Sequence, residues 1–242
     1  MQYFLDTVET IESGVGFSSF GACHLIWLAA FVVITVVCSL IYKKSGEKAR
    51  CVWRKVIASL LVADEIFKVT MLVIGDNYSL SYLPLHLCSI NIILIAIHAF
   101  KPSKLFDNLL YMACIPGAIA ALLFPTWTSL PVANFMHLHS FTVHILLALY
   151  PIMLTVGGDI YPQAKYIPKS LLTLAIMAVP IYFFNLFFDT NFMFLMSADE
   201  GNPLYWFGEN WGSHLLGYPV LITAVLIVMY VPLGIYRKLK KD

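Results

Sequence analysis

Seven long apolar stretches follow one another along the chain, separated by short polar segments. Each is close to the roughly twenty residues that an α-helix needs to cross the hydrocarbon core of a bilayer. The stretches run approximately over residues 20–42, 52–74, 83–100, 105–124, 137–157, 168–189 and 214–236. The pattern predicts an all-α membrane protein, a bundle of seven transmembrane helices that forms a single domain over residues 1–242.

The polar segments alternate in their content of lysine and arginine. In chain order they hold zero, six, zero, two, zero, two, zero and four basic residues, which are Lys43, Lys44, Lys48, Arg50, Arg54 and Lys55, then Lys101 and Lys104, then Lys165 and Lys169, and finally Arg237, Lys238, Lys240 and Lys241. Basic residues that flank spanning helices stay on the cytoplasmic side. Because the number of spans is odd, the N-terminus is predicted outside and the C-terminus in the cytoplasm.

The composition narrows the possible functions. Hydrophobic residues make up 60% of the chain and charged residues 12%, and the formal net charge is +1. The basic residues are spread among the loops rather than gathered on one face, so no nucleic-acid partner is predicted. The five cysteines form no CxxC pair, which argues against a structural zinc site and a disulfide framework. The histidine spacings do not match helical zinc sites either, so neither a metal nor a cofactor is predicted. A zinc site assembled between the third, fifth and seventh apolar stretches is the open alternative.

The fifteenth basic residue, Lys68, lies inside the second apolar stretch. A lysine within a span costs several kcal/mol unless it is partnered or hydrated, so it marks a functional candidate. Asp64 lies four residues before it and Glu65 three, and both spacings bring side chains together on one helix face. A buried structural ion pair and a functional network are both open. In the predicted orientation this group lies on the cytoplasmic side of the other polar residues, as the floor of a pocket.

Most other polar residues within the apolar stretches fall in the outer half of the membrane. They predict a polar pocket that opens outward, lined by His86, Cys88, Asn91, His139, His144, Asn185 and His214.

Cys88 is the candidate nucleophile of this pocket. A catalytic cysteine needs a base to form its thiolate. His86 lies about 200° away around a helix, so it cannot pair with Cys88 unless Pro84 distorts the turn. The base should therefore come from another helix, with His139 and His144 as the candidates, while Asn91 shares the face of Cys88. A small apolar packing role and a disulfide with Cys23 are the alternatives for this cysteine.

The polar segment between the sixth and seventh stretches is the longest of the outer loops. It covers about residues 190–213 and carries Trp206 and Trp211. Such aromatic residues suit the membrane interface, and the segment could equally fold over the mouth of the bundle as a lid.

Three segments carry a resemblance to a known family: LPLHLCSIN, HLHSFTVHILLALYPI and NPLYWFGENW. Together they resemble the YwaF-type family of bacterial integral membrane proteins, which is distantly similar to transmembrane protein 164 of animals. The resemblance covers nearly the whole chain and implies a multi-pass protein of the bacterial plasma membrane. The chain departs from the animal motif, in which Pro, Cys and His are adjacent, because Pro84, His86 and Cys88 are each separated by one residue.

The animal relative is described as a phospholipid acyltransferase that uses a Cys and a His, so the resemblance implies acyl transfer or hydrolysis on membrane lipids. An outward-facing site has no supply of acyl-coenzyme A, and the acyl donor would be a lipid. Asn91 or Asn185 could then donate a hydrogen bond to the oxyanion. A transporter or a small-ligand sensor that uses Asp64, Glu65 and Lys68 is the alternative function.

Overall fold

The computed structural model describes residues 2–198 and 202–239, and within these ranges it contains helices and turns but no β-strand. This confirms the all-helical prediction. The chain divides into two compact units, Met1–Pro162 and Gln163–Asp242. That the whole chain forms a single domain stays a prediction.

Unit 1, Met1–Pro162, holds the first five predicted stretches. Its elements are α1 (Ala22–Lys44), α2 (Glu47–Ile74), the short turn η1 (Leu80–Tyr82), α3 (Leu87–Phe100), α4 (Lys104–Leu109), the π-helical turn η2 (Leu110–Cys114), α5 (Ile115–Leu123) and α6 (Phe135–Gly157). Together α4, η2 and α5 take the place of the single helix expected over 105–124.

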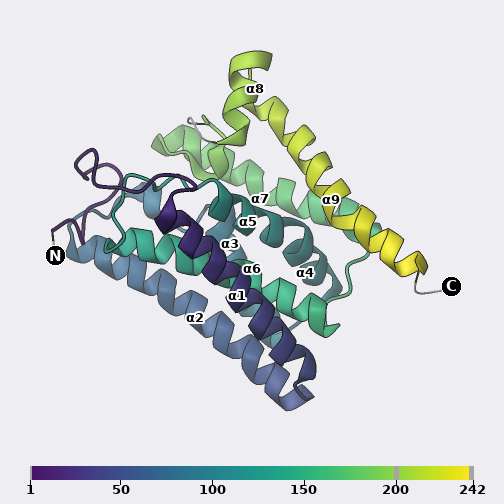
Figure 1. Cartoon of the computed structure of the whole chain (residues 1–242). Coiled ribbons are helices and arrows are strands. Elements are labelled where there is room, and N and C mark those ends of the chain that lie inside the picture. Colours follow the sequence, from purple (N-terminus) through teal and green to yellow (C-terminus); the bar gives the residue numbers. More distant parts are fainter. Residues whose placement is uncertain (1, 199–201, 240–242) are drawn as a thin grey trace. The chain divides into compact units, whose positions relative to one another are not determined.

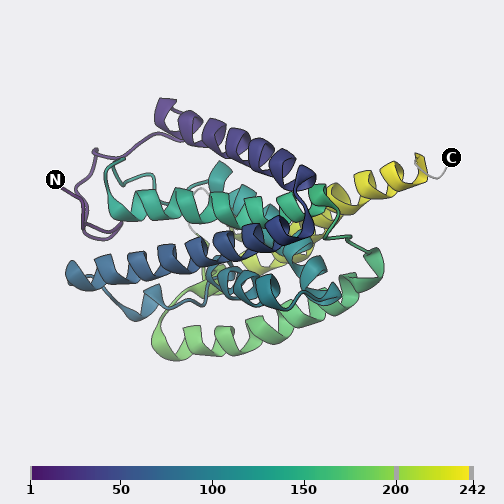
Figure 2. The ribbon, with the colours of Figure 1, turned by 90° about the horizontal axis from the view of Figure 1, so that it is seen from below.

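The central helix of unit 1 is α6. Figures 1 and 2 show it between α1 and α2, and it also contacts α3 and α5. Its sequence is apolar around most of its circumference, a pattern typical of a helix surrounded by protein or lipid. Most of its side chains are buried, including Phe135, Phe141 and Tyr150. Polar side chains on α6 must therefore find partners on the neighbouring helices.

The peripheral helix α1 differs sharply from α6 in burial. Only 17% of the most apolar part of α1 is buried inside the protein, and Ile26, Val32 and Val33 are exposed. A long helix that exposes aliphatic side chains needs lipid around it. Its outward face is therefore suited to contact with the acyl chains of a bilayer.

Five helical stretches among the described residues are long and apolar enough to cross a membrane. They are Ala22–Lys44, Lys104–Leu123, Phe135–Gly157, Ala164–Phe188 and His214–Tyr236. The chain is thus a multi-pass membrane protein, as predicted. Of the two other predicted spans, α3 is apolar but shorter, and α2 carries the charged residues Asp64, Glu65 and Lys68. Seven spans and the orientation of the termini stay predictions.

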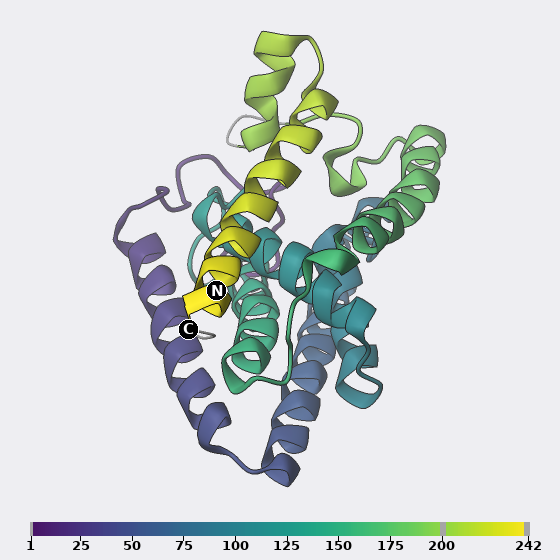
Figure 3. The same ribbon diagram turned by 90° about the vertical axis from the view of Figure 1, so that its right-hand side faces the viewer.

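Unit 2, Gln163–Asp242, holds the last two predicted stretches and one helix that the sequence pattern did not predict. Its elements are η3 (Ala164–Tyr166), α7 (Ile167–Phe188), η4 (Phe192–Phe194), α8 (Pro203–Trp211), η5 (His214–Leu216) and α9 (Gly217–Leu239). Within this unit, α8 folds back beside the start of α9 (Figure 3).

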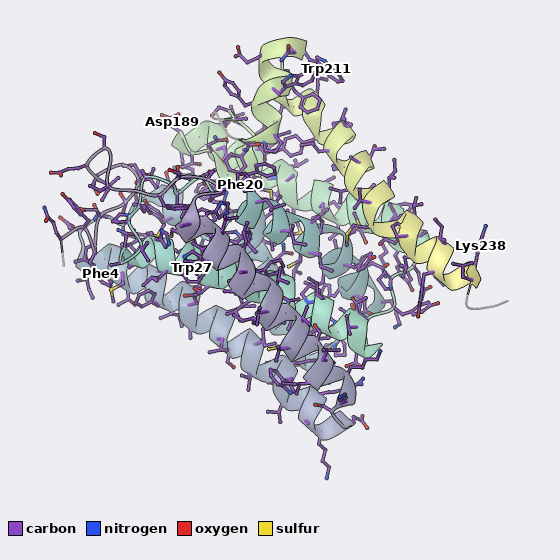
Figure 4. All side chains as sticks on the ribbon, in the orientation of Figure 1. Phe4, Phe20, Trp27, Asp189, Trp211 and Lys238 are labelled. Carbon is purple, nitrogen blue, oxygen red and sulfur yellow. The ribbon has the colours of Figure 1, made fainter. Side chains whose placement is uncertain are left out.

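Local signals explain the additional helix α8. Its N-terminus is capped by the Asn202 side chain, which accepts a hydrogen bond from the Leu204 backbone N–H at 2.9 Å, and Pro203 occupies the first turn. It ends at Gly212, whose φ of +75° favours glycine. The Phe207 ring packs edge-on against Trp211, which Figure 4 labels, with centroids 5.0 Å apart. Residues 203–211 of the predicted outer loop thus form a helix, and the interfacial or lid role of the loop stays open.

The chain before α1 is tied to the end of unit 1 at which α6 begins. The Asn134 side-chain amide donates to the backbone carbonyls of Tyr3 and Asp6, at 2.7 and 2.8 Å. The Asn77 amide donates to the carbonyl of Leu5 at 3.0 Å. Ordering the N-terminal segment costs conformational entropy, and these bonds offset that cost.

A further bond joins this segment to η1, just before Cys88 in the chain. The Tyr82 hydroxyl donates to the Glu9 carboxylate at 2.9 Å. Burial raises the pKa of the Glu9 carboxyl, but hydrogen bonds from Thr7 and Tyr82 lower it by more, so the net pKa lies below the usual value. The same bond, after burial, raises the pKa of the Tyr82 hydroxyl.

We expect the Glu9–Tyr82 bond to make the stability of unit 1 depend on acid. The ionised carboxylate stabilises the fold above its unfolded pKa, and this contribution is lost as pH falls through the lower folded pKa. Because Glu9 is largely exposed, the effect should not exceed about 1 kcal/mol. Thermal unfolding in detergent should show Glu9→Gln less stable than wild type at pH 7 and equal to it near pH 3. An equal difference at both pH values would contradict this assignment.

Candidate functional site

The site is built around the start of α3, which begins later than the sequence pattern predicted. The helix starts at Leu87 rather than at residue 83, with His86 as an extended cap residue (φ −68°, ψ 150°). Leu83, which precedes Pro84, is also extended (ψ 148°), as expected for a residue before proline. Cys88 is therefore the second residue of the helix, and His86 lies outside it.

A cysteine in the first turn of a helix has a special electrostatic environment. The first N–H groups of a helix have no partner within it and carry the positive end of the helix dipole. No side chain caps the N-terminus of α3. The thiolate of Cys88, or an oxyanion beside it, would therefore be stabilised by this helix end.

His144 on α6 contacts Cys88 directly. Its Nε2 lies 3.2 Å from the Cys88 Sγ, and its Nδ1 lies 2.6 Å from the backbone carbonyl oxygen of Ser140. A carbonyl can only accept, so Nδ1 carries the proton and Nε2 faces the thiol with its lone pair. A thiol, a ring nitrogen that could accept its proton and a carbonyl that orients the ring thus lie in the order that cysteine nucleophilic catalysis requires. Of the two histidines considered as the base, the structure brings His144 to the cysteine.

Asn91 lies one turn after Cys88 on α3. It is only 3% exposed, so its side-chain amide lies in the interior of unit 1. An amide N–H₂ is a hydrogen-bond donor that can serve a developing oxyanion. Its position on the face of Cys88 agrees with the spacing of the two residues.

The cysteines do not form the disulfide considered as an alternative. All five are free, including Cys23 and Cys88. Cys114, in the π-helical turn η2, donates a hydrogen bond to the carbonyl of Leu147 at 3.3 Å. It belongs to the hydrophobic core against which Cys88 packs, together with residues from the centre of α6.

A charged cluster joins α2 to α6 beside this pair, and we use this name for Asp64, Glu65, Lys68 and His139. Lys68 pairs with Glu65 at 2.6 Å. The Nδ1 of His139 lies 3.2 Å from Asp64 and its Nε2 lies 4.0 Å from Glu65. The Asp64 contact is an ion-pair distance without hydrogen-bond geometry. His139 is thus committed to the two carboxylates and does not face the cysteine.

Of the two acids that the spacing offered to Lys68, the structure pairs it with Glu65. Asp64 instead contacts His139 and the Thr142 hydroxyl, at 3.2 Å each. The cluster also lies toward the start of α6, since His139 precedes His144 by five residues, or about 7.5 Å of helix rise. In the predicted orientation it lies on the outer side of Cys88, so the prediction that it forms the floor of the pocket was wrong.

His86 belongs to the surroundings of the charged cluster. It lies within electrostatic range of Lys68. The cap residue of α3, two positions before Cys88, is thus close enough to Lys68 to feel its charge.

Two predicted pocket residues lie in unit 2. The Asn185 amide donates to the carbonyl of Phe192 at 3.0 Å and accepts from the N–H of Phe192 and the hydroxyl of Thr190. His214 lies 3.1 Å from the Phe194 carbonyl through its Nε2. Both side chains close turns within their own unit, and their part in the pocket stays a prediction.

The other histidines at the start of α6 and α1 have structural partners. His137 accepts a hydrogen bond from the Trp27 indole at 3.0 Å, and Figure 4 labels this tryptophan on α1. His24 bridges the Phe20 N–H and the Leu122 carbonyl. Neither takes part in a metal site, because no group of three or more His, Cys, Asp and Glu residues among those described could hold a metal ion.

Sequence reasoning missed two features. One is Trp127, whose ring stacks on His144 with centroids 5.5 Å apart and planes 5° from parallel. The other is an inner network, a name used here for Lys104, Asp107, His98 and Tyr150. In it, the two nitrogens of His98 contact Tyr150 and Asp107 at 2.9 Å each, and Lys104 pairs with Asp107 at 3.3 Å.

Comparison with known proteins places the chain in a family. A family model described as the TMEM164 family matches residues 19–230, which include every residue of the site in unit 1. A search of curated proteins and a search of solved structures each returned no match. The match confirms the resemblance to transmembrane protein 164, while the YwaF-type label stays a prediction. The chain belongs to the TMEM164 family.

Proposed function

We propose that this protein is a membrane-lipid acyltransferase, or a hydrolase when water is the acceptor, that acts through a thioester on Cys88. The observation that carries the proposal is the contact of 3.2 Å between the Cys88 thiol and the His144 imidazole, which the Ser140 carbonyl orients. Nucleophilic catalysis by cysteine needs this arrangement of thiol, base and orienting group.

The reaction would proceed in two halves. Cys88 Sγ attacks the carbonyl carbon of a lipid ester while its proton passes to His144 Nε2, and the carbonyl oxygen becomes an oxyanion. The intermediate collapses to a thioester as the leaving alkoxide takes the proton from His144. A hydroxyl of the acceptor, or water, then loses its proton to His144 and attacks the thioester, and the thiolate of Cys88 recovers a proton from the imidazolium.

Two groups on α3 would stabilise the oxyanion. The N–H groups at the start of the helix, which no side chain caps, lie next to Cys88, and the buried Asn91 amide lies one turn away. Fixed donors of this kind are typically the largest single contribution to acyl-transfer catalysis.

The length of α3 supports a lipid substrate. Its 14 residues span about 21 Å, some 9 Å less than the hydrocarbon core of a bilayer. If its Lys101 end lies at one membrane surface, Cys88 lies below the opposite surface. At this depth the site borders the acyl-chain region that membrane lipids occupy, whereas a water-soluble substrate would have to enter from the aqueous phase. Membrane lipids are therefore the partners that we propose.

The charged cluster would support this site rather than react. Lys68 is 7% exposed, and its pairing with Glu65 and the neighbouring His139 and Asp64 avoids an isolated buried charge. By joining α2 to α6 it holds the helix that carries His144.

Substitutions of Cys88 and His144 should show whether these residues take part in acyl transfer or serve only the stability of the fold. In vesicles with labelled phospholipid and a lysolipid acceptor, Cys88→Ala and Cys88→Ser should lose acyl transfer. His144→Gln should lower its rate by about 10²- to 10⁴-fold, the usual contribution of a general base. Cys38→Ala is the matched control, since Cys38 packs on the same core without contacting His144. Full activity in Cys88→Ala would show that the nucleophile is another group.

We also propose seven spans with the N-terminus outside, in the bacterial plasma membrane. Helices occupy each of the seven predicted stretches, and the basic residues alternate between the segments that separate them. A green fluorescent protein fused after residue 242 should fluoresce, and alkaline phosphatase fused there should be inactive. The opposite pair of results would reverse the orientation and move the site to the cytoplasmic half.

The second candidate function is a transporter, which the inner network favours. Its Tyr150, His98 and Asp107 side chains are buried, so the inner half of unit 1 holds more polar groups than the sequence pattern indicated. A transporter would pass protons or ions between this network and the charged cluster.

Glu65→Gln distinguishes the two functions. A transporter that uses this carboxylate should lose proton or ion flux in liposomes. The acyltransferase should show no flux in either form, while the variant is less stable by roughly 3–5 kcal/mol because Lys68 loses its buried partner. Adding Lys68→Met should restore much of that stability. Flux in the wild type that Glu65→Gln abolishes would favour the transporter.

A further inference from the structure

The indole of Trp127 is a buried hydrogen-bond donor without an acceptor. The residue is 8% exposed, and its Nε1 has no partner in the structure of the described residues. An indole N–H can only donate, and a buried donor left unpaired costs about 1–3 kcal/mol. A group of this kind in a well-packed core calls for an explanation, such as an acceptor that arrives with a ligand.

Trp127 is held against the catalytic pair. Its ring stacks on the face of His144 with centroids 5.5 Å apart, while the Nε2 edge of the same imidazole lies 3.2 Å from Cys88 Sγ. Phe141 packs edge-on against the indole at 5.2 Å and fixes its plane. The Trp127 ring and the Cys88 thiol thus contact the same imidazole, one at its face and the other at its Nε2 edge.

A second, partly buried indole in the same aromatic group, that of Trp27, has a hydrogen-bond partner. Trp27 stacks on Phe141 with centroids 4.9 Å apart, and its N–H donates to His137. Both tryptophans contact Phe141, yet only Trp127 lacks an acceptor and contacts His144. Packing and the bond to His137 account for Trp27, whereas packing leaves the N–H of Trp127 unexplained.

From these contacts we infer that Trp127 is a further catalytic residue, whose indole N–H donates to the carbonyl oxygen of the acyl group as Cys88 attacks it. This inference rests on the proposed acyl transfer. When the bond between Sγ and the carbonyl carbon forms, the π electrons of the C=O bond move to oxygen, and that oxygen is the acceptor that Trp127 lacks in the free protein. When the intermediate collapses, the C=O bond re-forms and the leaving alkoxide takes the proton that His144 holds.

The kinetic test compares Trp127→Phe with Trp27→Phe in the full-length protein in vesicles. Trp127→Phe keeps an aromatic ring against His144 but removes the donor. It should lower kcat by about 100-fold, the effect of removing one oxyanion donor, with KM changed little. Trp27→Phe should stay within a few-fold of wild type. Equal rates for the two variants would overturn the inference, whereas full activity of Cys88→Ala would overturn the proposed function itself.

A spectroscopic test covers the case in which Trp127→Phe does not fold. A long-chain alkyl trifluoromethyl ketone should add the Cys88 thiol across its carbonyl and leave a tetrahedral carbon with an oxygen in the place of the oxyanion. In wild-type protein carrying ¹⁵N-labelled tryptophan, this adduct should move the N–H resonance of Trp127 downfield and leave that of Trp27 in place. An adduct on Cys88 that leaves the Trp127 resonance unmoved overturns the inference, and the lack of any adduct overturns it together with the proposed function.

Discussion

The structure of unit 1 depends on one constraint: polar groups on the central helix α6 must be satisfied by neighbouring helices, because lipid offers them no partners. His137 meets Trp27 of α1, His139 meets the carboxylates of α2, and His144 meets Cys88 of α3. Each contact both removes an unpaired polar group from the apolar core and fixes the rotation of α6 against one neighbour. The same contacts that hold the bundle together thereby place His144 against Cys88.

The chemistry of the site follows from two local features that meet at this helix. Pro84 delays the start of α3, so that Cys88 lies at a helix N-terminus rather than in the middle of a span. The Ser140 carbonyl, one turn before His144, sets the protonated nitrogen of the imidazole. A thiol at the positive end of a helix and a base in the correct tautomer are both produced by backbone geometry.

Much of the fold could be predicted from the sequence, since long apolar runs and alternating basic loops are strong signals. The side-chain contacts of the site were harder to predict, because the local sequence allows more than one partner for the same residue. His139 and His144 are five residues apart and point about 140° away from one another, so only one can face α3, and helix periodicity does not say which. Lys68 can reach either Asp64 or Glu65 along its own helix, and residues on α6 decide between them. Trp127 lies in the loop before α6, where no periodic pattern predicts its contact with His144.

The central claim is that Cys88 carries the acyl group. The most direct measurement is the intact mass of the purified protein after incubation with a labelled phospholipid and no acceptor, followed by peptide mapping. We expect an added acyl chain on Cys88 that hydroxylamine removes, and no such adduct when His144 is replaced by Gln. An unmodified Cys88 in protein that still transfers acyl groups would contradict it.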